Sequence, residues 1–330
     1  MTAVMRKLAT FFLAAALVAG CALVPSEFNG DGAPRQVEIV PLRSQRPLVA
    51  LALGGGGARG FAHVGVIKAL EDAGIEADIV TGASSGAVVA ALYAGGRPAG
   101  EIWNIALTLE RDDIVDFVVI GEGWVKGEAL QNFVNRLVND KSIEQLPRRF
   151  AIVATEAKNH RMTVFNRGNT GVAVRASASV PRLFVPPVIN GEKYVDGGLT
   201  SPVPVKLARA MGADIVIAVD VSWFAQARNA AGPGMAEHRR RYRYALLAEE
   251  LEAADVVITP QTVRTRMLDF DHKEQNIIAG EEAGRDAAPR IRKLIEQVAA
   301  RKRALNHHRS SMNEDKSAGH SVVGTGDGNW

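Results

Sequence analysis

Cysteine is nearly absent from this sequence, and net charge is small. The 330 residues include one cysteine, Cys21, so an intramolecular disulfide is excluded. No cysteine and histidine cluster offers metal ligands, and we expect neither a metal nor another cofactor. The 39 Lys and Arg residues exceed the 36 Asp and Glu residues by only +3, which argues against nucleic acid as a partner. The uncharged run from Leu8 to Ala19 is too short for a bilayer span, which needs roughly 20 apolar residues.

The first residues have the order of a secretory signal. Arg6 and Lys7 precede the uncharged run 8–19, and small residues then lead to Cys21. This exit resembles the lipobox of bacterial lipoproteins, in which the cysteine receives a diacylglyceryl group and a further acyl chain. Several acyl chains anchor a protein stably. Ala22 rather than aspartate follows, which by the same resemblance favours the outer membrane of the bacterial envelope, facing the periplasm. An ordinary signal peptide with a chance cysteine is the alternative.

Composition divides the chain into four parts. We expect a lipoprotein-type signal peptide over residues 1–20. The lipidated cysteine and a tether rich in Gly, Pro and Ser are expected over 21–46. One large domain over 47–303 follows, since an α/β domain can exceed about 200 residues undivided. Residues 304–330 are polar, and we expect a disordered tail there.

Short apolar runs alternate with amphipathic segments in the large domain. The apolar runs predict strands at 48–53, 79–81, 150–154, 162–165, 215–219 and 256–258. Helices are predicted at 61–73, 87–94, 127–137, 204–211, 236–253 and 272–301. Because continuous apolar strands are typical of parallel sheets covered on both faces, the pattern predicts a three-layer α/β/α fold with a mostly parallel central sheet.

A serine stands between two glycines where a strand leads into a helix. In the run 82–86, Gly82 and Gly86 lie two positions either side of Ser84. This is the context of a nucleophile elbow, in which a sharp turn projects the serine hydroxyl away from the sheet. A Cβ atom at either glycine is expected to collide across the turn. Ser85 has such a glycine on one side only, and either serine alternatively caps the helix.

A glycine-rich loop follows the first strand of the domain. It contains Gly55, Gly56, Gly57, Arg59 and Gly60. Glycines between a strand and a helix present bare backbone N–H groups, which stabilise negative charge. The loop therefore forms either an oxyanion hole or a dinucleotide-binding site.

The residues after this loop favour the oxyanion hole. A dinucleotide fold carries an acidic residue about 20 positions on, at the end of its second strand. Here Asp78 precedes that strand, and the elbow at Ser84 occupies the expected position of the acid.

Asp196 is the expected partner of the serine. It begins the run Asp196-Gly197-Gly198, which alone is a common turn. A Ser-Asp-His triad needs a histidine after the acid. His238 lies among arginines and His272 among acidic residues, and the other later histidines lie in the tail. A two-residue Ser84–Asp196 site therefore explains the sequence better than a triad.

Together these motifs resemble those of bacterial patatin-like phospholipases. The resemblance runs from about 48 to 210, and more loosely to about 301, and it includes the small-residue segment 176–181 before the acid. It implies a patatin-like acyl hydrolase domain over 47–303, with Ser84 as nucleophile and Asp196 as base. Backbone N–H groups of the glycine loop would stabilise the oxyanion, and Arg59 would hold the loop or add charge.

The resemblance also implies a substrate and a setting. The substrate is a phospholipid or lysophospholipid, cleaved at a fatty-acyl ester on a membrane surface to which lipidated Cys21 holds the enzyme. The alternative is a non-catalytic lipoprotein of the same fold that binds lipid or a partner protein, although such a protein needs none of the three motifs. The sequence carries no signal for an oligomeric state.

Overall fold

The computed structural model of the chain describes residues 26–118, 123–222 and 235–319. The predicted signal peptide, Cys21 and the last residues of the tail, 320–330, lie outside these ranges. In the described part of the chain, no helix has both the length and the apolar character that crossing a bilayer requires.

The centre of the fold is a nine-stranded sheet whose inner strands are parallel. Its order is β1-β6-β7-β4-β3-β2-β8-β9, with β5 also paired to β4. The run β4-β3-β2-β8-β9 is parallel, whereas β5, β6 and β7 form antiparallel pairs. The strands are β1 (Glu27–Phe28), β2 (Val49–Leu53), β3 (Ile79–Gly82), β4 (Arg149–Glu156), β5 (Met162–Phe165), β6 (Val188–Ile189), β7 (Glu192–Val195), β8 (Ile215–Val219) and β9 (Val256–Ile258).

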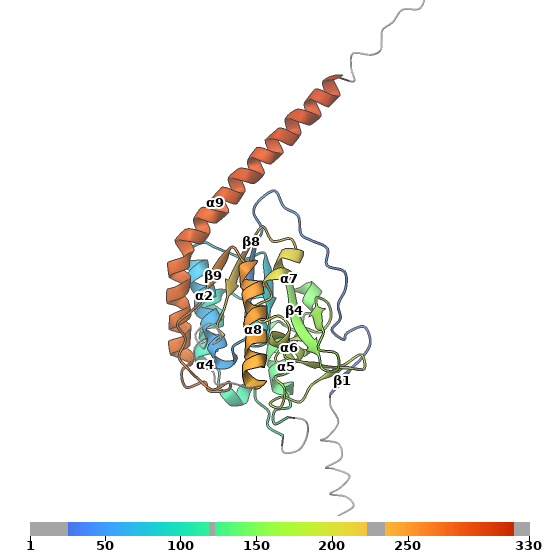
Figure 1. Cartoon of the computed structure of the whole chain (residues 1–330), viewed down its shortest axis with the longest axis vertical. Helices are drawn as coiled ribbons and strands as arrows, with labels where there is room; N and C mark the ends of the chain where they lie inside the picture. The colour runs from blue at the N-terminus through green and yellow to red at the C-terminus, as the bar shows by residue number, and fades with distance from the viewer. Residues whose placement is uncertain (1–25, 119–122, 223–234, 320–330) are drawn as a thin grey trace, which may run out of the picture.

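Helices cover both faces of this sheet, which confirms the predicted three-layer α/β/α fold. Figure 1 shows α2 and α9 side by side at the left of the view, and α8 upright near the middle. The helices are α2 (Phe61–Asp72), α3 (Ser85–Ala94), α4 (Ala99–Thr108), α5 (Glu128–Leu137), α6 (Thr170–Ser177), α7 (Val205–Ala210), α8 (Met235–Glu252) and α9 (Lys273–Gly319). The described residues also form the short 3-10 turns η1 (Gly57–Gly60), η2 (Arg111–Asp113), η3 (Ile143–Gln145) and η4 (Gly197–Leu199).

The alternation of side chains along β2 separates two cores. Leu51 and Leu53 point into the larger core, to which α2, α3, α4, α5, α6 and α9 contribute. Ala50 and Ala52 point to the other face, where α7 and α8 pack. Because every residue of β2 is buried, the strand reads as one apolar run in the sequence.

Two glycines allow α2 and α9 to touch backbone to backbone. A Cβ atom at Gly65 would lie 1.9 Å from the carbonyl oxygen of Ile277. One at Gly280 would lie 1.9 Å from the carbonyl oxygen of Ala62. No side chain fits at either position without separating the helices.

The structure corrects the expected tether and tail. Residues 26–46 pack on the domain: β1 pairs with β6, Ala33 is buried, and the Leu42 N–H donates to the Met211 carbonyl over 2.8 Å. In place of a disordered tail from residue 304, α9 continues to Gly319 and extends away from the domain (Figure 1). The residues beyond 304 are mostly polar but contain no proline, and extending an existing helix is easier than starting one.

Candidate active site

Ser84 lies on a strained turn between β3 and α3. Its φ is 53° and its ψ is −127°, a conformation that a residue with a Cβ rarely adopts. The two flanking glycines prevent different collisions. A Cβ at Gly82 would lie 2.6 Å from Ala87 Cα, across the turn as predicted. One at Gly86 would instead lie 2.2 Å from the Leu53 carbonyl oxygen of β2. The strained geometry matches a nucleophile elbow.

The Ser84 hydroxyl donates a hydrogen bond to the carboxylate of Asp196. The distance from Ser84 Oγ to Asp196 Oδ2 is 2.6 Å, although 112 positions separate the residues. Asp196 directly follows β7, and its Oδ1 accepts the Gly198 N–H over 2.7 Å. A Cβ at Gly197 would lie 2.1 Å from the Val153 carbonyl oxygen, so the acid loop lies tightly against β4.

Burial raises the pKa of the Asp196 carboxyl above its ordinary value. The hydrogen bonds from Ser84 and Gly198 and the positive charge of Arg243 act in the opposite direction, because each favours the ionised form. Since burial is the largest contribution, the carboxylate binds a proton more tightly than an exposed aspartate. That property is useful in a base for a serine hydroxyl.

The small-residue segment 176–181 contacts both residues. The Ser84 N–H donates to Ser177 Oγ over 3.0 Å, and the Asp196 N–H donates to the Ser179 carbonyl over 2.8 Å. The segment therefore holds the serine turn and the acid loop in one relative position.

The glycine loop has fewer free donors than the sequence suggests. The Gly55 N–H donates to the Pro202 carbonyl and the Gly56 N–H to Ser85 Oγ, both over 3.0 Å. Among the described residues, no acceptor is bonded to the Gly57 N–H or to the Ser85 N–H, and both residues line the pocket over Ser84. Gly60 belongs to η1 and also lines this pocket.

Arg59 holds the loop and does not line the pocket. Its Nε donates to the Val221 carbonyl over 2.8 Å, beyond the end of β8. Burial lowers the pKa of Arg59, and the nearby Asp220 carboxyl opposes that shift. Of the two roles considered for Arg59, the geometry favours the structural one.

The histidine side chains that the structure describes have other surroundings than the serine hydroxyl and the acid. His63 Nε2 donates to the Gly54 carbonyl over 2.7 Å, and burial lowers the pKa of His63 to about 4, so its ring is neutral at pH 7. His272 Nδ1 lies 3.9 Å from an Asp269 carboxylate oxygen. No described histidine is hydrogen-bonded to Ser84 or Asp196. The side chain of His238 is not among those described.

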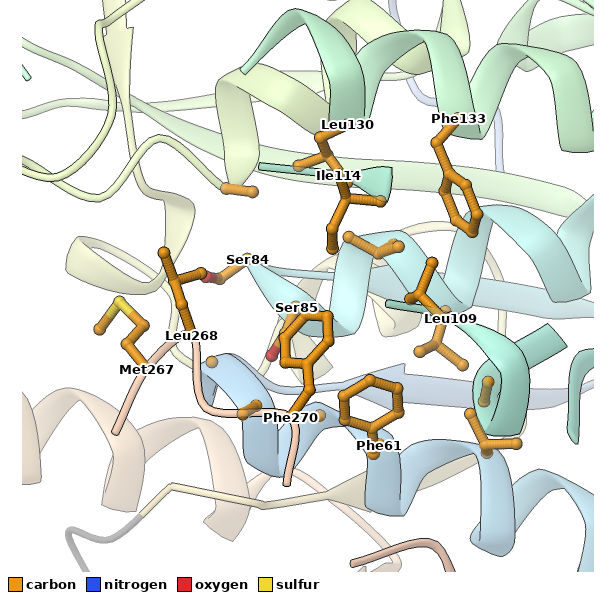
Figure 2. Close-up of a pocket in the computed structure, with 18 of the residues that line it drawn as sticks. Phe61, Ser84, Ser85, Leu109, Ile114, Leu130, Phe133, Met267, Leu268 and Phe270 are labelled. Carbon is orange, nitrogen blue, oxygen red and sulfur yellow. The ribbon is translucent and has the colours of Figure 1, made fainter. Parts of the chain in front are cut away.

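An apolar pocket of about 850 Å³, including its open mouth, lies over Ser84. Figure 2 shows Ser84 and Ser85 facing a space surrounded by apolar side chains from several parts of the chain. Those labelled are Phe61, Leu109, Ile114, Leu130, Phe133, Met267, Leu268 and Phe270. Ser84 and Ser85 supply the only side-chain polar atoms among the described lining residues.

Two parts of this site are absent from the sequence-based prediction. The first is the Ser85 N–H, although the residue after the nucleophile supplies an oxyanion donor in known nucleophile elbows. The second is the pocket wall from α4, whose apolar residues Ile102, Ile105 and Ala106 have helical spacing. The sequence contained a signal for each of them.

Sequence comparisons match the region that carries this site. The family model described as patatin-like phospholipase matches residues 51–209. An uncharacterised NTE family protein of Mycobacterium tuberculosis is 37% identical over 182 residues, which is 54% of this chain and 50% of that protein. Lysophospholipase NTE1 of Yarrowia lipolytica is 34% identical over 188 residues, which is 52% of this chain and 12% of that protein. The chain thus spans half or less of these relatives' length.

A solved structure supports the fold. The structure of VipD from Legionella pneumophila superimposes with a TM-score of 0.53 at 15% sequence identity, covering 80% of this chain and 70% of VipD. At this sequence identity, the superposition shows a shared fold and carries no information about activity. The matched family model places the region 51–209 of this chain in the patatin-like phospholipase family.

Proposed function

We propose that this protein is a serine acyl hydrolase that cleaves a fatty-acyl ester of a phospholipid or lysophospholipid. The observation that carries the proposal is the 2.6 Å hydrogen bond from Ser84 Oγ to buried Asp196 beneath an apolar pocket. A nucleophile paired with a base is the minimum that acyl transfer requires.

In the proposed reaction, the Asp196 carboxylate accepts the Ser84 proton as Oγ attacks the ester carbonyl carbon. The tetrahedral intermediate then expels the alcohol, which takes the proton from Asp196, and an acyl group stays on Ser84. Water attacks that acyl group with Asp196 again as base. The products are a fatty acid and the free serine.

The backbone N–H groups of Gly57 and Ser85 are the proposed oxyanion donors. Both are free of acceptors within the described structure, and both residues line the pocket beside Ser84. Gly55 and Gly56 already donate elsewhere, so they support the loop. Removing one oxyanion donor typically lowers kcat by about 100- to 1000-fold.

The pocket lining supports a lipid as substrate. Because the lining residues that the structure describes include no charged side chain, the pocket suits an acyl chain, while a charged head group would stay outside. The name of the Yarrowia relative, a lysophospholipase, agrees with this substrate class.

The test of the function is product analysis with lysophospholipid and diacyl phospholipid micelles. We expect free fatty acid together with the deacylated phosphodiester. Release of phosphate or of the head-group alcohol would contradict acyl transfer. A folded protein that cleaves no ester would instead support the alternative, a lipoprotein that binds lipid without cleaving it.

Activity should depend on pH through Asp196. The reaction needs the carboxylate, so kcat/KM should rise with pH through the raised pKa of Asp196, above the value of about 3.9 for an exposed aspartate. The same shift makes the free energy of unfolding depend on pH. The stabilising contribution of Asp196 is fully present below about pH 3.9 and is lost as pH rises through the folded-state pKa. A pH–rate profile with its acid limb at or below about pH 4 would contradict this assignment.

We also propose that Cys21 carries the lipid anchor. The proposal rests on the residues around Cys21, which resemble a lipobox. Expressed in a bacterium with radioactive palmitate, the chain should become labelled and the Cys21→Ser variant should not. Equal labelling of both chains would reject the anchor and leave the ordinary signal peptide.

A further inference from the structure

Two large aromatic side chains beside the pocket are unusually exposed to solvent. Trp124 is 63% exposed and Phe117 61%, the two highest values among the large apolar side chains that the structure describes. Met267, which lines the pocket, is 43% exposed and thereby marks the pocket mouth. We name these three side chains, Phe117, Trp124 and Met267, the mouth surface.

The segments that carry the aromatic residues are fixed to the pocket wall. Phe117 pairs with Val125 in an antiparallel bridge, and the Trp124 N–H donates to the Leu183 carbonyl over 2.8 Å. Val125 is buried with Phe184, a residue of the pocket lining. Leu268, the neighbour of Met267, packs against the same cluster. The mouth surface is therefore continuous with the pocket wall.

Asp116 holds this region in place from the side of α5. Its carboxylate accepts the backbone N–H groups of Gly127, Glu128 and Ala129 at 2.6 to 2.9 Å. A carboxylate at this position satisfies free donors at the helix N-terminus and complements the helix dipole. The aromatic side chains therefore stay exposed on a segment that is fixed in place. Burying a Phe or Trp side chain would remove about 150–250 Å² of its surface from water, which is favourable.

The two cations on the segments that carry the aromatic residues each have a carboxylate close by. Arg111 lies over the Phe117 ring at 5.8 Å and also 3.5 Å from an Asp112 carboxylate oxygen. Lys126 is paired with Glu128 at 2.7 Å. Exposed aromatic groups whose neighbouring cations already have carboxylate partners suit the interface of a lipid bilayer, where Trp is favoured.

We propose that the mouth surface inserts into the lipid interface, so that the pocket opens directly into the membrane. This inference rests on the proposed function for its purpose, since a lipid could then enter the pocket without crossing water. To the proposed function, this inference adds how the enzyme is oriented on the membrane that contains its substrate. Because apolar contact drives the insertion, binding to phosphatidylcholine vesicles should change little with salt, which screens exposed charges.

The direct test is the fluorescence of Trp124 in the full chain on phosphatidylcholine vesicles, with Trp103, Trp223 and Trp330 replaced by Phe. We expect the emission to move to shorter wavelength and lipids brominated on their acyl chains to quench it. A matched chain that keeps only Trp103, a half-buried residue of α4, should not be quenched. Emission from Trp124 that vesicles leave unchanged would overturn the proposal, even if an anchor elsewhere holds the chain on the membrane.

A second test separates docking from chemistry. The Phe117→Ser/Trp124→Ser variant should hydrolyse bilayer phospholipid at least about tenfold more slowly and a short soluble ester at a rate within about twofold of the parent. Val40→Ser/Leu305→Ser is the control, because these side chains are 60% and 56% exposed away from the pocket lining. Equal loss in both variants, or equal loss on both substrates, would contradict docking. A parent chain that cleaves no ester rejects the proposed function, and the fluorescence test still decides docking.

Discussion

Ser84→Ala should lower kcat/KM for lysophospholipid by at least about 10⁴-fold, because it removes the proposed nucleophile. Asp196→Asn should lower it by about 10³-fold or more, because an amide cannot accept the Ser84 proton. In the proposed mechanism the two residues act as one unit through the 2.6 Å hydrogen bond, so the double variant should be no slower than Ser84→Ala alone. Fatty-acid release from micelles under single-turnover conditions measures all three.

Folding must be unchanged for these losses to report chemistry. Removing the buried charge of Asp196 is not expected to lower the free energy of unfolding, because a buried carboxylate is costly to ionise. Ser85→Ala is the matched comparison, because it removes a neighbouring hydroxyl that accepts the Gly56 N–H but keeps the backbone N–H of residue 85, so we expect a smaller loss than in Ser84→Ala. Full activity in Asp196→Asn, or a larger loss in Ser85→Ala than in Ser84→Ala, would reject the assigned roles.

Gly65→Ala and Gly280→Ala should each destabilise the fold by more than about 3 kcal/mol, above the usual cost of overpacking a core. The new Cβ atom would lie 1.9 Å from a backbone oxygen in each case, and backbone cannot move aside as a side chain can. The expected consequence is separation of α2 from α9, with partial loss of the larger core. Urea unfolding followed by far-ultraviolet circular dichroism measures the change.

Gly100→Ala is the control for this prediction. Gly100 also lies in a helix, α4, but a Cβ there would meet no atom within 4 Å. Alanine is favoured over glycine in a helix by about 1 kcal/mol, so this variant should be unchanged or slightly more stable. If all three variants unfolded at the same urea concentration, the close contact between α2 and α9 would be contradicted.

The sequence predicted the sheet well because burial on both faces makes a strand visible as an apolar run. All five residues of β2 and of β8 are buried, and both strands were predicted from their apolar residues. The motifs at Ser84 and Asp196 were also predicted, since glycines at fixed spacing have a steric cause there. That the two side chains meet depends on strand order, which local sequence does not contain.

Features set by tertiary contacts were predicted less well. Helix α6 contains Val172 and Val174, whose branched side chains favour strands, and packing in the larger core overrides that preference. The strand β1 has two residues and is stabilised by pairing with β6, so it carries no pattern of its own. Whether a backbone N–H group of the glycine loop is free depends on acceptors far along the chain, such as the Pro202 carbonyl.

The central claim is that Ser84 is the nucleophile and that Asp196 activates it. The most direct measurement is mass spectrometry of the full chain after reaction with a fluorophosphonate, which bonds covalently to an activated serine. We expect one phosphonyl group on the peptide carrying Ser84, much slower labelling in Asp196→Asn and none in Ser84→Ala. Labelling of Ser85, or equal labelling rates with and without the Asp196 carboxylate, would contradict the account.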